Sequence, residues 1–160
     1  MNIRLKSFSL LAMTLAFTGC VSSNGMVSFK RPSSKEGLTT MERQLSMARL
    51  GERHGQIETA HKIYEKVLLQ DADNVEALHR LGVMSAKTQD YETAISYLTK
   101  AEMNDPSNVE LLNDLGYALF LTDDLAGAEE KLRLAIRLNP SHRAARNNLG
   151  LVLGLSLIHI

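Results

Sequence analysis

A pattern of residues that recurs after 34 positions constrains the fold of this chain more than any other feature. Between about Asn74 and Pro140, large, small and helix-breaking residues stand in matching columns. The first unit holds Leu78, Leu81, Gly82, Ala94, Leu98, Ala101 and Pro106, and the second holds Leu112, Leu115, Gly116, Ala128, Leu132, Ala135 and Pro140. A fixed period of this kind marks a stacked repeat, in which each unit covers the apolar face of its neighbour.

Each unit predicts two helices, because residues at spacings i, i+3 or i+4, and i+7 share one helical face. The first face consists of Leu78, Leu81 and Ser85, and the second consists of Ala94, Leu98 and Ala101. The small residues Gly82 and Ala94 let the two helices approach closely, whereas Pro106 cannot continue a helix. Each unit is therefore a pair of helices closed by a proline.

These columns resemble the tetratricopeptide repeat (TPR) family, whose pattern runs through Leu-Gly, Ala, a large residue, Ala and a closing Pro. Leu78 and Leu112 stand where Trp is common in the family, which conserves the bulk needed for packing. The resemblance implies an all-α fold, a right-handed α-solenoid of helix-turn-helix repeats with three full units and a truncated fourth. The expected TPR domain covers 41–154, with repeats at about 41–73, 74–107, 108–141 and 142–154, the last of them partial.

The pattern extends in both directions from the two clearest units. Ala60, Tyr64 and Val67 fill the second-helix columns one period earlier, and Leu149-Gly150 repeats the Leu-Gly pair one period later. The first unit is degenerate, since it lacks the closing proline, as expected of a terminal repeat. The expected helices are about 41–53, 57–70, 75–88, 91–103, 108–121, 125–137 and 142 onwards.

Polar residues mark where these helices begin. Asn74, Asn108 and Ser141 precede first helices of a unit, and Asp90 and Asp124 precede second helices. Side-chain oxygens at such positions accept hydrogen bonds from N–H groups of the first turn that have no partner within the helix. Gly55 permits the tight turn inside the first unit.

Residues 1–19 have the composition of an export signal, in which Arg4 and Lys6 precede a short apolar run. The run is too short to span a bilayer as a mature helix. Cys20 is the only cysteine and directly follows this segment, an arrangement that resembles the bacterial lipoprotein signal. The resemblance implies acylation of Cys20, and Val21 after it favours the outer membrane. The alternative is a plain secretory signal with a chance cysteine.

Residues 20–40 comprise the acylated cysteine and a stretch rich in Ser, Gly and Lys without helical periodicity, which predicts a flexible tether. At the other end, residues 155–160 form an apolar run where the repeat requires a polar turn. They also match the translation of a transposon end common in sequencing libraries. We therefore expect a sequencing-adapter artefact there and a longer native chain, with a genuine apolar C-terminal helix as the alternative.

Composition and motifs predict a protein that is not an enzyme. The 18 basic and 18 acidic side chains balance to a formal net charge of zero, which gives no reason to expect a nucleic-acid partner. The histidines lack Cys or acidic partners at metal-ligand spacing. The chain has no Gly-rich phosphate loop and no Gly-x-Ser-x-Gly elbow. We expect no metal and no cofactor.

What remains is a binding surface for protein or peptide partners. The TPR resemblance implies that first helices line a concave groove, and the predicted groove residues are His79, Arg80, Asn113, Asp114, Tyr117, Phe120, Asn147 and Asn148. Side-chain amides donate and accept at once, which suits an extended peptide backbone, and the aromatic pair offers an apolar anchor. The alternative is that Asn113, Asn147 and Asn148 solvate their helices or bond to neighbouring repeats.

A lipid-modified cysteine followed by these repeats resembles TPR lipoproteins such as those of the TadD type in Flp (tight-adherence) pilus assembly, with the PilF and NlpI types as near alternatives. The resemblance implies a scaffold fixed by lipid to the bacterial outer membrane, facing the periplasm, that assists assembly of a pilus or secretion machine. Two alternatives stay open: an adaptor for periplasmic cell-wall hydrolases or proteases, and the N-terminal TPR region of a longer enzyme.

Overall fold

The computed structural model describes residues 39–158, and this part of the chain contains α-helices and no β-strand. The helices are α1 (Thr40–Arg53), α2 (Ile57–Leu68), α3 (Val75–Lys87), α4 (Tyr91–Asn104), α5 (Val109–Leu121), α6 (Leu125–Leu138) and α7 (Arg143–Ile158). The predicted signal peptide at 1–19, Cys20, the tether as far as residue 38, and residues 159–160 lie outside the described residues.

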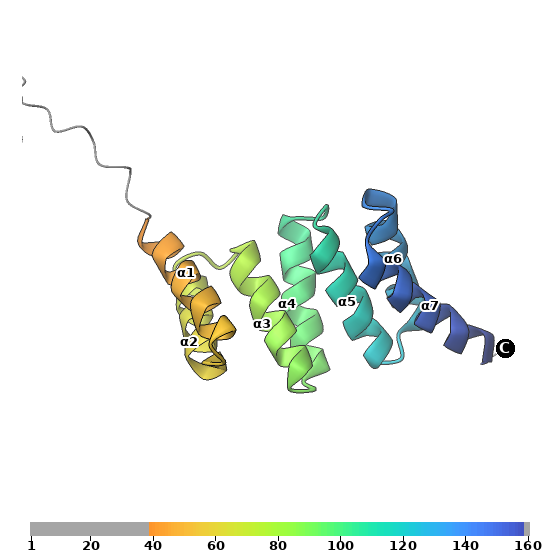
Figure 1. The fold of residues 1–160 in the computed structure, drawn as a ribbon, viewed down its shortest axis with the longest axis horizontal. Coiled ribbons are helices and arrows are strands. Elements are labelled where there is room, and N and C mark those ends of the chain that lie inside the picture. The colour runs from red at the N-terminus through yellow and green to blue at the C-terminus, as the bar shows by residue number, and fades with distance from the viewer. Residues whose placement is uncertain (1–38, 159–160) are drawn as a thin grey trace, which may run out of the picture. The chain divides into compact units, whose positions relative to one another are not determined.

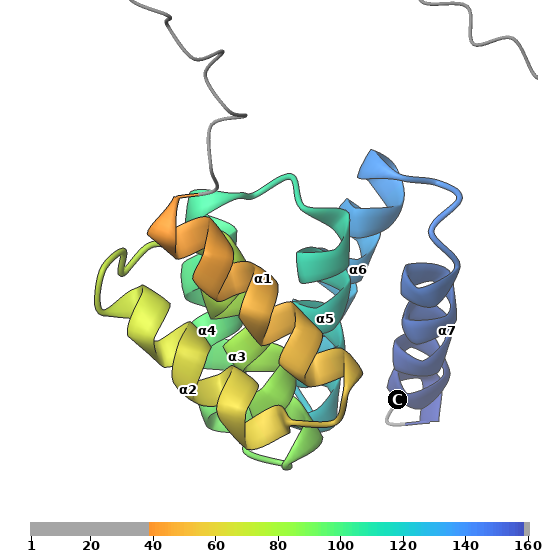
Figure 2. The ribbon, with the colours of Figure 1, turned by 60° about the vertical axis from the view of Figure 1, so that its left-hand side comes forward.

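The helices pair in chain order, and the pairs stack side by side (Figure 1). The three pairs are α1 with α2, α3 with α4, and α5 with α6. The single helix α7 packs against α5 and α6 as the first helix of a fourth unit (Figure 2). The predicted fold class, a right-handed α-solenoid of helix-turn-helix repeats, is confirmed.

Most of the predicted helix starts have the expected caps. The side chains of Asn74, Asp90, Asn108 and Asp124 each accept a hydrogen bond from a backbone N–H of the first turn. The prediction for Ser141 is wrong, because the Nδ1 atom of His142 accepts the bond from the N–H of Ala145 instead. Ser141 is engaged elsewhere: its backbone N–H and its hydroxyl both donate to Oδ1 of Asn139, at 3.0 and 2.7 Å.

The turn between the helices of each pair has one backbone conformation, whichever residue occupies it. Gly55, Gln89 and Asp123 stand one repeat period apart and have φ angles of 72°, 65° and 65°. A positive φ is uncommon for residues with a Cβ atom, so the sequence signalled this turn only at the glycine. In each turn the N–H of the following residue donates to a carbonyl near the end of the first helix, Gln56 to Gly51, Asp90 to Ser85 and Asp124 to Leu119.

Two glycines set the distance between the helices of a pair. A Cβ atom on Gly82 would lie 2.7 Å from Cγ of Leu98, and one on Gly116 would lie 2.7 Å from Cγ of Leu132. Ordinary contacts between carbon atoms are about 3.5–4.0 Å long, so no side chain fits at either position without a shift of the facing leucine or its helix. Each glycine therefore receives a leucine from the second helix of its own unit.

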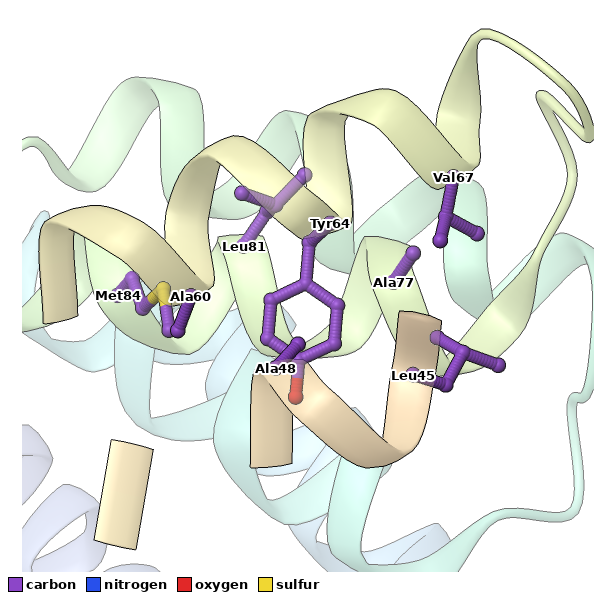
Figure 3. Close-up of a cluster of buried hydrophobic side chains, with 8 residues drawn as sticks. All are labelled: Leu45, Ala48, Ala60, Tyr64, Val67, Ala77, Leu81 and Met84. Atoms are coloured by element: carbon purple, nitrogen blue, oxygen red, sulfur yellow. The ribbon is translucent and has the colours of Figure 1, made fainter. Parts of the chain in front are cut away.

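The apolar core consists of clusters, each shared between a unit and the first helix of the next. The cluster in Figure 3 joins Leu45 and Ala48 of α1, Ala60, Tyr64 and Val67 of α2, and Ala77, Leu81 and Met84 of α3. Leu81 and its counterpart Leu115 are both almost fully buried, with exposures of 0% and 1%. Each pair thus leaves an apolar face that only its neighbour covers, which explains why single units of this kind do not fold alone.

The glycine contact predicts opposite effects for the same substitution at two positions. In Gly82→Ala, the new methyl group collides with Leu98, and overpacking of about 1–3 kcal/mol outweighs the helix-propensity gain of about 1 kcal/mol. In Gly150→Ala, a Cβ atom meets nothing within 4 Å, so only the gain in helix propensity remains. Urea unfolding followed by far-UV circular dichroism should show a lower free energy of unfolding for the first variant and a higher one for the second. Equal stabilisation of both would contradict the steric role of Gly82.

Candidate functional site

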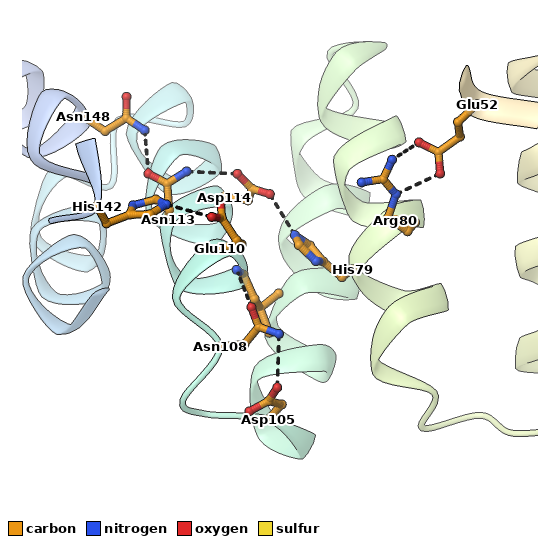
Figure 4. Close-up of polar contacts among 11 residues, drawn as sticks. Glu52, His79, Arg80, Asp105, Asn108, Glu110, Asn113, Asp114, His142 and Asn148 are labelled. Carbon is orange, nitrogen blue, oxygen red and sulfur yellow. Dashed lines mark hydrogen bonds and ion pairs between the residues drawn. The ribbon is translucent and has the colours of Figure 1, made fainter. Parts of the chain in front are cut away.

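The side chains of the first helices α1, α3, α5 and α7 form one surface, here called the inner face, on which contacts run from helix to helix (Figure 4). Successive first helices carry equivalent side chains one repeat period apart. The inner face therefore consists of columns of residues in register, and neighbouring members of a column come from neighbouring repeats.

Four of the predicted groove residues join into one chain of hydrogen bonds, the polar ladder, formed by His79, Asp114, Asn113 and Asn148. The Nε2 atom of His79 lies 2.8 Å from Oδ2 of Asp114. The amide of Asn113 donates to Oδ1 of Asp114 at 3.1 Å and accepts from the amide of Asn148 at 3.0 Å. The ladder connects α3, α5 and α7, so Asn113 and Asn148 bond to neighbouring repeats, the alternative that the sequence left open.

Burial distinguishes the asparagines of this face. Asn113 is buried, with 6% of its surface exposed, and its amide nitrogen and oxygen both have partners. Asn147 is exposed and is in none of the side-chain hydrogen bonds among the described residues. Asn113 therefore holds the first helices together, whereas Asn147 is free to meet solvent or a ligand. A role for either in peptide binding stays a prediction.

Arg80 is committed to an ion pair within the fold. Its guanidinium donates two hydrogen bonds to the carboxylate of Glu52 on α1, one of them from Nε to Oε1 at 2.8 Å. The hydroxyl of Tyr64 donates to the same carboxylate at 2.7 Å. Burial alone would raise the pKa of Glu52, but the hydrogen bonds from Arg80 and Tyr64 outweigh it and lower this pKa. Burial and the bond to Glu52 raise the pKa of Tyr64 well above its usual range.

A hollow of about 380 Å³ lies between α3, α4 and α5, here called the Tyr117 groove. It is lined by Val83, Ala86, Lys87, Gln89, Tyr91, Leu98, Asp114, Tyr117 and Leu121. Tyr117 is 40% exposed, and its ring stacks on that of Phe120, with the centroids 6.2 Å apart. Phe120 itself packs on the apolar cluster below it. In the predicted aromatic pair, Tyr117 is therefore the ring exposed in the groove, and Phe120 is the ring that connects it to the apolar core.

A second hollow of about 400 Å³, here called the arginine hollow, is lined by Arg49, Glu52, Arg53, Glu76 and Arg80. Arg49 donates to both carboxylate oxygens of Glu76, at 2.6 and 2.8 Å, and Arg80 pairs with Glu52. Arg53 has no ion-pair partner within residues 39–158. It is therefore the cation of this hollow that is available to a ligand.

Sequence reasoning missed Arg53 and Lys87 as candidate residues. They stand one repeat period apart, in the same column as Leu121. Leu121, the residue after the predicted groove residue Phe120, was not among the residues predicted, and its column contains Lys87 and Arg53 one and two periods earlier. Elsewhere in the described helices, no three His, Cys or acidic side chains gather closely enough to hold a metal ion. None of these helices is long and apolar enough to cross a membrane.

A family model described as Tetratricopeptide repeat matches the chain over residues 45–109 and again over 87–142, together more than half of its length. The chain belongs to the tetratricopeptide repeat family. The family resemblance predicted from the Leu-Gly, Ala, Leu, Ala and Pro columns is therefore confirmed, and the two matches together extend from within α1 to the residue before α7.

Solved structures contain the same TPR fold. A crystal structure of MamA has 30% identity and a TM-score of 0.67, and the alignment covers 72% of this chain and 63% of MamA. A mutant O-GlcNAc transferase from Thermobaculum terrenum has 27% identity and a TM-score of 0.67, over 72% of this chain and 23% of the transferase. The chain thus spans less than two thirds of the length of either protein.

The first TPR of Spaghetti (RPAP3), bound to an HSP90 peptide, has a TM-score of 0.69 over 73% of this chain and 93% of that domain. Its identity of 17% shows a common fold alone. No curated protein sequence matches the chain.

The contrast between Asn113 and Asn147 predicts different costs for the same substitution. Asn113→Ala removes a buried amide that serves two partners, which should lower the free energy of unfolding by about 1–3 kcal/mol. Asn147→Ala alters an exposed position and should change it by less than about 0.5 kcal/mol. Urea unfolding of both variants, compared with the unmodified chain, provides the measurement. Similar small effects would mean that the polar ladder adds little to the stacking of the repeats.

Proposed function

We propose that this TPR protein is a scaffold that binds protein or peptide segments along its inner face. The observation that carries the proposal is the Tyr117 groove, an open and mostly apolar hollow with an exposed aromatic ring that stacks on Phe120. Binding hot spots are typically aromatic side chains in apolar pockets with polar groups at the edge. Here Tyr117 is the anchor, and Asp114 and Lys87 are the polar groups at the edge.

Fold-level analogy supports a peptide as the ligand. Two structural neighbours, both TPR domains of RPAP3, are in complex with peptides of HSP90 and HSP70, and this chain has their fold at 17% and 21% identity. The analogy concerns the kind of ligand and not its sequence, because shared fold does not carry a shared binding site. The residues that recognise a ligand here must be those of this chain's own inner face.

We further propose that the repeats are fixed by an acyl group on Cys20 to the outer membrane and face the periplasm. In that place the scaffold assists assembly of a pilus or secretion machine, as a TadD-like lipoprotein, or serves as an NlpI-like adaptor for cell-wall hydrolases or proteases. The position of the single cysteine after an export signal supports the anchor. The likeness to part of an O-GlcNAc transferase favours a second candidate, the N-terminal arm of a longer enzyme.

Substitution of the cysteine tests the anchor. In a Gram-negative host, Cys20→Ala should abolish labelling by radioactive palmitate and move the protein out of the outer-membrane fraction, because no thiol remains to carry the acyl chains. Ser22→Ala, two residues later, is the control and should change neither result. Unchanged recovery of Cys20→Ala in the outer-membrane fraction would contradict lipid anchoring.

Substitution of the aromatic anchor tests the scaffold. Peptides are selected from a random display library against the full chain, which carries Cys20→Ser to prevent acylation. Tyr117→Ala should weaken binding of these peptides by roughly tenfold or more, as expected of a hot-spot aromatic residue. Met103→Ala is the matched control, because Met103 is 80% exposed on the second helix α4, outside the inner face. If both variants lose affinity equally, or if the selected peptides bind both with unchanged affinity, the Tyr117 groove is not the peptide-binding site.

A further inference from the structure

The inner face changes in character along the stack of repeats. One column of equivalent residues runs Arg49, Val83, Tyr117 and Leu151, and a second runs Arg53, Lys87 and Leu121. Both columns begin with cations on α1 and end with apolar side chains on α5 or α7. The arginine hollow, between α1 and α3, and the Tyr117 groove, between α3, α4 and α5, are therefore neighbouring parts of one surface, the first more cationic and the second more apolar.

The acidic side chains of this surface are occupied by partners inside the fold. Among the described residues, the acids on first helices are Glu42, Glu52, Glu76, Glu110 and Asp114, and each has a hydrogen-bond partner. For example, Asp114 is bonded to both His79 and Asn113. At Asp114 and Glu52, whose hydrogen bonds are partly buried, a basic ligand would have to displace a partner and leave a polar group unpaired. The Glu110 side chain is 69% exposed, and a basic ligand there would compete with His142.

Only some of the basic side chains on the inner face form ion pairs. Arg49 and Arg80 are used by Glu76 and Glu52, but Arg53 and Lys87 are exposed and have no ion-pair partner within residues 39–158. Arg53 lines the arginine hollow, and Lys87 lines the Tyr117 groove one repeat further along. The charge that this surface offers to a ligand is therefore positive, although the chain as a whole is neutral.

We propose that the inner face selects an extended peptide segment with acidic side chains at one end and a large apolar side chain at the other. The acidic residues lie over Arg53 and Lys87, and the apolar residue enters the Tyr117 groove beside Val83 and Leu121. This inference rests on the proposed scaffold function and adds the chemistry and the orientation of the ligand.

The repeat spacing sets the positions of these side chains in the ligand. Packed helices lie about 8–10 Å apart, and successive first helices pack less closely than the helices of a pair. An extended chain advances about 3.3 Å per residue, so each repeat corresponds to at least about three ligand residues. The acid over Lys87 is therefore expected about three positions from the apolar residue. The acid over Arg53, one repeat further away, is expected about six positions from it.

The experiment reads the ligand chemistry directly from selected peptides. A randomised display library, with members of about seven residues or more, is selected against the full chain carrying Cys20→Ser. The expected peptides carry Asp or Glu about three and about six positions from a large apolar residue. Double charge reversal, Arg53→Glu with Lys87→Glu, should weaken their binding about tenfold, as measured by fluorescence anisotropy.

Two matched measurements separate a specific effect from a general one. Lys62→Glu with Lys66→Glu makes the same change in net charge on α2, at exposed lysines away from the inner face, and should leave the affinity unchanged. Replacement of the peptide's acids by Lys should restore binding to the Arg53→Glu, Lys87→Glu variant. Circular dichroism verifies that all variants are folded.

The outcomes distinguish this inference from the scaffold function. Selected peptides that share an apolar residue without acids, and that lose affinity with Tyr117→Ala but not with charge reversal, would overturn the inference and leave the scaffold standing. A preference for basic peptides would also overturn it. If the full chain enriches no peptide at all, both the inference and the proposed peptide-binding function fail.

Discussion

The contact between a glycine of one helix and a leucine of the next is the constraint on which the rest of this structure depends. Gly82 receives Leu98, and Gly116 receives Leu132, at a distance that leaves no room for a side chain on the glycine. This close approach closes the α3–α4 and α5–α6 pairs and sets the apolar face that the next first helix covers. The register of the first helices, and with it the inner face, follows from this packing.

The inner face combines a rigid frame with a few exposed groups. The polar ladder and the Glu52–Arg80 pair hold neighbouring first helices together, so most polar side chains there satisfy one another. A surface held in this way is organised before a ligand arrives, which reduces the entropy lost on binding. The exposed groups that remain include the ring of Tyr117 and the cations Arg53 and Lys87, to which we assign the proposed selectivity of this surface.

The sequence predicted the fold well because the repeat signal is local and periodic. The ends of α1–α6 and the start of α7 lie within two residues of their expected positions, and four of the five expected polar caps are present. The prediction for Ser141 failed because Asn139, two residues earlier, competes for its hydroxyl, a contact that depends on the turn geometry. The candidate site was harder to predict, since Asn113 and Asn147 look alike in sequence and differ only in burial.

By itself the sequence determined the repeat, the helix pairs and the positions where backbones approach, because spacing and residue size decide which side chains share a helical face. Only the tertiary structure decided which polar residues of the inner face are occupied by one another and which stay exposed. Partners such as His79 and Asp114, or Glu52 and Arg80, come from different repeats, and stacking alone brings them within hydrogen-bonding distance. The inner-face side chains available to a ligand are those that these pairings leave exposed.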